Sequence, residues 1–114
     1  MLPYAMFDVR YYYTVDDKPP FERWFNKLNA VAAAKVTIAL VRLGQGNTSN
    51  VKSVGDGVAE FRINAGPGYR IYFGRDGEAL VILLTGGDKG SLQRDIEHAM
   101  IYWKDYKRRK PQTN

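Results

Sequence analysis

Two short segments of alternating polar and apolar residues flank Gly66-Pro67-Gly68 in the stretch EFRINAGPGYRIYF. Because successive side chains point to opposite faces of a strand, the alternation predicts a β-hairpin with one apolar face. Both apolar sets meet the same core only if odd-numbered residues pair with odd-numbered residues. A loop of three residues, 66–68, satisfies this condition, and a loop of two residues does not. The stretch therefore predicts a β-hairpin with a three-residue turn.

This predicted register places two arginines on the face of the hairpin away from the core. Arg62 is expected opposite Tyr72, and Arg70 opposite Asn64. The two arginines are then diagonal neighbours, about 7–8 Å apart. Arginine is well suited to a bidentate contact with phosphate, and a tyrosine between two arginines suits base stacking. The structural alternative is a solvated sheet face with no ligand.

Three further charged residues are expected near these arginines. Glu60 lies one step along the same face, Lys52 belongs to the preceding strand, and Lys89 comes just after the following strand. The sequence therefore predicts a surface suited to a phosphate backbone, formed by Lys52, Arg62, Arg70, Tyr72 and Lys89.

The rest of the chain has the pattern of an α+β protein. A helix is expected to start after Asp16-Asp17, with an acidic N-cap followed by two prolines in its first turn. Asn29 is expected to cap the N-terminus of a second helix. An apolar run, Leu80–Leu84, predicts a central strand covered on both faces. In order, we expect a strand over 4–14, two helices as a hairpin up to residue 43, strands over 50–54, 58–65, 69–73 and 78–85, and a helix after Ser91. We expect a single domain, 1–114, with one mixed sheet backed by helices and a basic tail from about residue 104.

Composition excludes several kinds of site. The chain has no cysteine and one histidine, so we expect no disulfide, no thiolate nucleophile, no metal site and no cofactor. His98 is expected to be an exposed helix residue.

The net charge is +5, but five basic residues lie between Lys104 and the end, so the overall charge says little about the body of the protein. Residues 1–13 do not resemble a signal peptide and no segment is long enough to span a membrane, which predicts a cytoplasmic protein.

The order GDGV, EFRI, GPGYRIYF and VILLTGGDK, between a pair of helices and a basic helix, resembles the RelE/ParE toxin superfamily. The resemblance covers about residues 11–109 and is strongest to the HigB-like, phage-derived addiction module killer group. It implies the toxin of a toxin–antitoxin pair, with a cognate antitoxin as partner, expected to be a small helix-turn-helix protein. RelE-like members cleave mRNA on the ribosome without a metal, and ParE-like members poison gyrase.

The resemblance also implies roles for individual residues. Arg70 matches the arginine that stabilises the scissile phosphate in RelE-like toxins, and Arg62 matches a basic residue of the first hairpin arm. Lys52 matches a basic residue on the strand before the hairpin, and Lys89 lies near a basic residue that follows the last strand. Glu60 stands where some members have lysine. The C-terminal tyrosine or histidine of that branch is missing here.

The chemistry of RNA cleavage without a metal requires attack of a 2′-hydroxyl on the adjacent phosphorus. Arg62, Arg70 and Lys89 are expected to stabilise the added negative charge. Glu60 is the candidate base, and Lys52 or Lys89 the candidate acid. We therefore expect a ribosome-dependent mRNA endonuclease. A gyrase-poisoning toxin and a non-catalytic RNA-binding domain are the alternatives.

Overall fold

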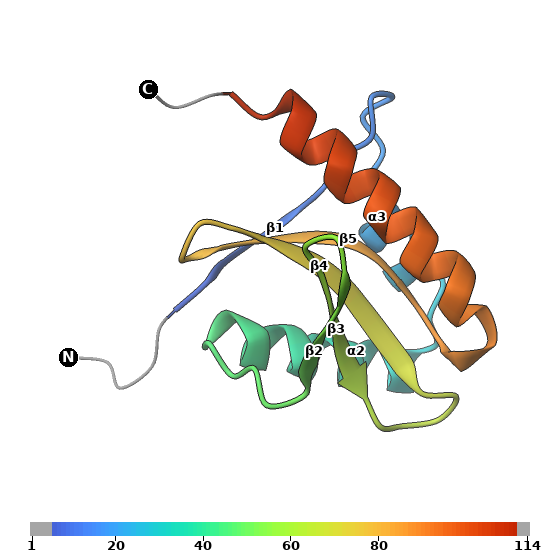
Figure 1. The fold of residues 1–114 in the computed structure, drawn as a ribbon. Helices are drawn as coiled ribbons and strands as arrows, with labels where there is room; N and C mark the ends of the chain where they lie inside the picture. Colours follow the sequence, from blue (N-terminus) through green and yellow to red (C-terminus); the bar gives the residue numbers. More distant parts are fainter. Residues whose placement is uncertain (1–5, 112–114) are drawn as a thin grey trace.

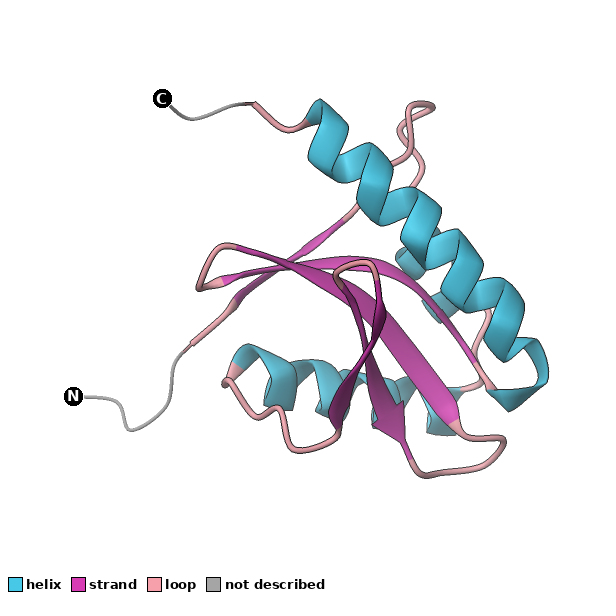
Figure 2. Cartoon of the chain, in the orientation of Figure 1, coloured by secondary structure: helices cyan, strands magenta, loops and turns pink. Residues whose placement is uncertain are grey.

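The computed structural model describes residues 6–111 as three layers, with one five-stranded sheet between helices (Figures 1 and 2). The elements are β1 (Asp8–Tyr11), α1 (Pro20–Phe25), α2 (Ala30–Gly44), β2 (Val51–Gly55), β3 (Val58–Ile63), β4 (Tyr69–Asp76), β5 (Leu80–Gly87), a 3₁₀ turn (Lys89–Ser91) and α3 (Leu92–Arg109). The strand order is β1-β5-β4-β3-β2. Strand β1 pairs parallel with β5, and the other pairs are antiparallel. The expected α+β class and the mixed sheet are therefore confirmed.

Helices cover both faces of the sheet, whereas the sequence had suggested that the arginine-bearing face was free of the core. In Figure 1, α2 lies below the sheet and α3 crosses above it. Phe21 of α1 and Val36 of α2 pack with the sheet residues Phe61 and Ile71 in one apolar cluster. A second cluster on the opposite face contains Trp103 of α3. Because α3 packs on that face, the sheet residues Tyr72, Ile82 and Leu84 are buried there.

The central position predicted for the fifth strand is confirmed. Residues Val81, Ile82, Leu83 and Leu84 are all buried, and β5 lies between β1 and β4. Strand β1 is shorter than the segment expected over 4–14, and residues 4 and 5 of that segment lie outside the described residues. No helix within residues 6–111 is long and apolar enough to cross a membrane.

The predicted helix caps have mixed outcomes. The side chain of Asn29 accepts a hydrogen bond from the backbone N–H of Ala32 at 2.9 Å, which confirms it as the cap of α2. The acidic cap predicted for α1 is wrong, because Pro19 occupies the cap position and makes no side-chain hydrogen bond there. Asp17 instead adopts a left-handed conformation, with φ 60°, in the turn before the helix.

The predicted hairpin turn is two residues too short. Arg62 pairs directly with Arg70 and Ile63 with Tyr69, so the loop contains five residues, 64–68. Odd residues still pair with odd residues, as predicted. The apolar pattern determines only that the loop length is odd, and three- and five-residue loops both satisfy it. The longer loop forms because the backbone N–H of Gly68 bonds to the carbonyl of Ala65 at 3.0 Å, which closes a turn over 65–68.

Candidate functional site

A basic depression lies at the end of the β3–β4 hairpin. Its volume is about 320 Å³, and we call it the hairpin depression. Three of the predicted site residues, Arg62, Arg70 and Lys89, line it together with the loop residues of the hairpin. Arg62 and Arg70 are directly opposite each other on neighbouring strands, where Cβ atoms are about 5 Å apart. The structure therefore brings the two arginines closer than the predicted diagonal.

Glu60 lies beneath the two arginines and holds both of them. Its carboxylate accepts a hydrogen bond from Nε of Arg62 at 3.0 Å, and its other oxygen lies 3.5 Å from Nε of Arg70. Two like charges directly opposite each other destabilise a sheet, and the carboxylate between them offsets that repulsion. The Glu60 side chain is 1% exposed, whereas that of Arg62 is 46% exposed. Glu60 is thus positioned to orient the arginines, and its burial argues against the predicted role as a base.

Arg70 is fixed in place from two sides. Its Nη1 donates a hydrogen bond to the carbonyl of Gly68 at 2.9 Å, and Glu60 contacts its Nε. Gly68 adopts φ 74°, a left-handed conformation that glycine takes without strain. This conformation belongs to the loop whose carbonyl Arg70 contacts. Arg70 is 8% exposed, so little of its guanidinium reaches the hairpin depression. The exposed part of the charge there comes mainly from Arg62 and Lys89.

The structure contradicts the prediction that Tyr72 stacks on a base. Tyr72 is 0% exposed and pairs with Glu60 across the two strands. It belongs to the apolar cluster beneath α3, which the sequence pattern did not place on this face. Burial, and then the nearby Glu60 carboxylate, raise the pKa of Tyr72. Tyr72 therefore supports the site from below and does not contact a ligand.

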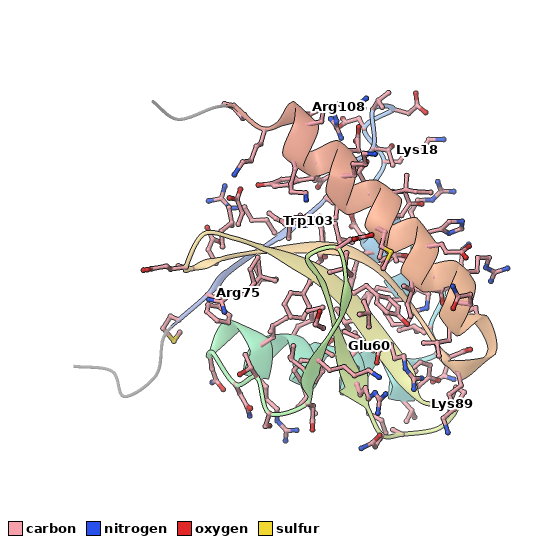
Figure 3. All side chains as sticks on the ribbon, viewed as in Figure 1. Lys18, Glu60, Arg75, Lys89, Trp103 and Arg108 are labelled. Atoms are coloured by element: carbon pink, nitrogen blue, oxygen red, sulfur yellow. The ribbon has the colours of Figure 1, made fainter. Side chains whose placement is uncertain are left out.

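Lys89 reaches the hairpin depression from the turn after β5, as predicted. Figure 3 shows it beside the hairpin loop. Its backbone N–H donates to the carbonyl of Pro67 at 3.3 Å, and a Cβ at Gly68 would lie 3.3 Å from its Cγ. Asp88 accepts a hydrogen bond from the N–H of Gly90 at 2.7 Å. Asp88 is thus a turn cap, and the GGDKG segment forms a strand end and a 3₁₀ turn.

Lys52 is separated from the hairpin depression by one strand. It pairs with Glu60 across β2 and β3 and is exposed, but it does not line the hairpin depression. The structure therefore places Lys52 at the margin of the site. His98 is exposed on α3, as expected, with its ring 6.2 Å from that of Tyr102.

Sequence reasoning missed Asp95, which is buried beside the site. Its carboxylate accepts a hydrogen bond from Ser91, and a Cβ at Gly87 would overlap with it. Glycine at position 87 therefore allows α3 to approach β5 closely. The signal in the sequence is an acidic residue in helical register with the buried residues Ala99 and Trp103. Within residues 6–111, no group of three or more His, Cys, Asp or Glu residues is arranged to hold a metal ion.

Comparison with known proteins places this fold and site in a family. A profile described as "Phage derived protein Gp49-like (DUF891)" matches residues 23–104, which include every candidate site residue. A protein of Haemophilus influenzae, described only as uncharacterized, is 45% identical over 82 residues, which are 71% of this chain and 83% of that protein. The chain belongs to the Gp49-like family of phage-derived proteins. That family is of the RelE toxin type, which is consistent with the toxin of a toxin–antitoxin pair.

Proposed function

We propose that this protein is a HigB-like toxin that cleaves mRNA on the ribosome without a metal and is neutralised by a cognate antitoxin, expected to be a small helix-turn-helix protein. The observation that carries the proposal is the convergence of Arg62, Arg70 and Lys89 on the hairpin depression. Such a cluster stabilises the charge that develops on phosphorus in the transition state. Membership of a RelE-type family supports the same function.

The chemistry begins with a 2′-hydroxyl that attacks the adjacent phosphorus. The 2′-hydroxyl gives up its proton to water, the phosphorus–O5′ bond breaks and the leaving oxygen takes a proton, so that one fragment ends in a 2′,3′-cyclic phosphate and the other begins with a 5′-hydroxyl. Arg62 and Lys89 contact the non-bridging oxygens, and Arg70 adds its charge from the floor of the hairpin depression. Glu60 fixes the positions of both guanidiniums and takes no proton itself.

Proton transfer has few candidate groups in the hairpin depression. Among the described lining residues, Lys89 and Tyr69 have the side-chain types that serve as general acids in enzymes. Lys89 is our candidate for the acid that protonates the leaving oxygen. Because neither histidine nor carboxylate lines the hairpin depression within residues 6–111, we expect weak activity on free RNA. The ribosome then contributes by holding the RNA in line for attack.

The test is to add the purified protein to a translating extract and map the mRNA 5′ ends by primer extension. We expect cuts at regular codon positions, and fragments whose 5′-hydroxyl accepts phosphate directly from a polynucleotide kinase. Arg70→Lys keeps the charge but loses the planar fork that the Gly68 carbonyl and Glu60 hold in place, so the charge is displaced and cleavage should fall at least tenfold. Arg62→Gln, at a half-exposed position, should cause a similar loss without unfolding the protein.

The matched control is Arg94→Gln, an exposed arginine on α3 outside the hairpin depression, which should cleave like the unchanged protein. Cleavage that is equal in the Arg62 and Arg94 variants would contradict the proposed site. Intact mRNA together with inhibited supercoiling by gyrase would instead favour a ParE-like toxin. Binding of RNA with no cleavage of any substrate would favour a non-catalytic RNA-binding domain.

A further inference from the structure

Two more depressions adjoin the hairpin depression and share lining residues with it. One lies between α2 and β3 and shares the segment 62–65 with the hairpin depression. The other lies between the start of α2 and the hairpin loop, and shares Gly66 and Tyr69 with it. The two further depressions have Lys35 in common. The three depressions therefore adjoin at the tip of the hairpin, and we call them together the hairpin groove. Its parts lie on both faces of the sheet, because Arg62 and Arg70 share the α3 face with Tyr72 whereas α2 packs on the opposite face.

Among the described residues that line the hairpin groove, every charged side chain is a cation. Lys35 and Arg42 of α2 join the three cations of the hairpin depression along its walls. No Asp or Glu within residues 6–111 lines any part of the hairpin groove, because Glu60 is buried beneath it. Lys35 and Arg42 are exposed and make no ion pair with any other described residue. Their charges are therefore free to meet an anion.

The positions of these two residues match an extended polyanion. They are seven positions apart on α2, which puts them on the same face and separates them by about 10 Å along the helix axis. That separation exceeds the size of one phosphate, so each cation meets a different one. Asn50 and Asn64 also line the hairpin groove, and their amides both donate and accept hydrogen bonds. Ile38 and Tyr69 add partly exposed apolar surface against which a base can pack.

We propose that the hairpin groove binds single-stranded RNA flanking the reacting phosphate, with Lys35 and Arg42 as positioning residues for the neighbouring phosphates. This inference rests on the proposed function, because it takes the hairpin depression as the place of the reacting phosphate. The depressions along α2 share lining residues with that depression, and no carboxylate among residues 6–111 lines any of them, which favours one polyanion that passes around the hairpin tip. An acidic protein segment is the competing occupant, and the experiment separates the two.

The test measures binding of a fluorescent single-stranded RNA of about nine nucleotides by anisotropy over a range of salt concentrations. The variant Lys35→Gln/Arg42→Gln should bind roughly tenfold more weakly near physiological salt. The slope of log affinity against log salt should become less steep by about 0.7 for each cation lost, because each releases one phosphate contact. The charge-conserving variant Lys35→Arg/Arg42→Lys should bind like the unchanged protein.

The matched control is Lys104→Gln/Lys107→Gln, which removes two charges from α3 outside the hairpin groove. If the two double variants lose affinity equally, the groove makes no specific contribution and the inference is wrong. Absence of RNA binding by the unchanged protein would also overturn it. The inference is also wrong if Lys35→Gln/Arg42→Gln binds RNA normally but no longer binds a polyglutamate peptide. The groove would then be a site for an acidic protein partner.

The same variants distinguish this inference from the proposed function. If Lys35→Gln/Arg42→Gln weakens RNA binding but the unchanged protein cleaves no mRNA, the hairpin groove stands and the nuclease does not. If mRNA is cleaved in an Arg62-dependent way but the α2 variant binds and cleaves RNA normally, the nuclease stands and the extension of the site along α2 does not.

Discussion

At the scale of single residues, Glu60 has the most influence on the candidate site. Its side chain is buried, and its two oxygens face Arg62 and Arg70 on the same sheet face. Removing one partner of a buried ion pair leaves the remaining charge without compensation. Here the loss would also leave two guanidiniums opposite each other on neighbouring strands.

We therefore expect Glu60→Gln to lower the free energy of unfolding by about 3 kcal/mol, because it leaves Arg70 buried without a counter-charge. Urea denaturation at neutral pH measures this change. The control is Glu97→Gln at an exposed position on α3, which should change stability by less than about 0.5 kcal/mol. Adding Arg70→Met to Glu60→Gln should restore part of the loss. Simple additivity of the two changes would show that the pair does not interact.

At the scale of secondary-structure elements, two tryptophans join the helices to the sheet by lying on strand glycines. Trp103 of α3 covers Gly74 of β4, where a Cβ would come within 2.4 Å of the indole ring. Figure 3 shows Trp103 between α3 and the sheet. Trp24 of α1 covers Gly86 of β5, where a Cβ would come within 2.2 Å. These close contacts set the distance between the helices and the sheet, so the glycines are part of the packing.

Gly74→Ala should destabilise the protein by about 1–3 kcal/mol, because the added methyl group forces Trp103 and α3 away from β4. Thermal unfolding followed by circular dichroism measures the effect. Gly44→Ala at the end of α2 is the matched control, since a Cβ there would lie 3.8 Å from its nearest neighbour. A Gly74 variant as stable as the Gly44 variant would mean that α3 adjusts its position at little cost.

At the scale of the whole molecule, the C-terminal part of α3 is tied to the segment just after β1 and to the end of β4. Asp105 accepts a hydrogen bond from the hydroxyl of Tyr12 at 2.6 Å and forms ion pairs with Arg108 and Arg109. Lys110 pairs with Asp76 at 2.7 Å. The first half of the predicted basic tail is therefore helix and contacts the body of the protein, and part of its charge is neutralised there.

This cluster predicts how stability depends on pH. The hydrogen bond from Tyr12, and then that from Arg109, lower the pKa of Asp105 from 3.8 to about 2. The stabilisation is therefore complete above the unfolded value and is lost as the pH falls from about 4 to about 2. Burial, and then the hydrogen bond to Asp105, raise the pKa of Tyr12 from 10.0 to about 12. That contribution is complete below the unfolded value and is lost as the pH rises from about 10 to about 12.

Urea denaturation at several pH values checks this prediction with Asp105→Asn. The variant should be less stable than the unchanged protein at neutral pH, and the difference should shrink as the pH approaches about 2. Asp56→Asn, in an exposed turn without an ion pair among residues 6–111, should keep the pH dependence of the unchanged protein. A stability difference for Asp105→Asn that stays constant with pH would contradict the assignment.

The order of the elements, the buried central strand, the odd-numbered pairing of the hairpin and a shared face for Arg62 and Arg70 were all predictable from the sequence, whereas the direct pairing of the two arginines was not. The central strand follows from a continuous apolar run, and the pairing of the hairpin follows from alternation and turn residues. All of these signals act between neighbours in the chain. These features were therefore predictable without the rest of the fold.

Only the tertiary structure decided which side chains of the site are accessible. Helix α3 covers the face that the alternating pattern had suggested was open, so Tyr72 and Glu60 are buried. Of the three cations that line the hairpin depression, Arg62 and Lys89 are exposed and Arg70 is buried. The contact of α2 with the hairpin tip likewise brings Lys35 beside residues far along the chain. Burial depends on contacts between distant segments, and a local pattern contains no information about which helix will cover a given face.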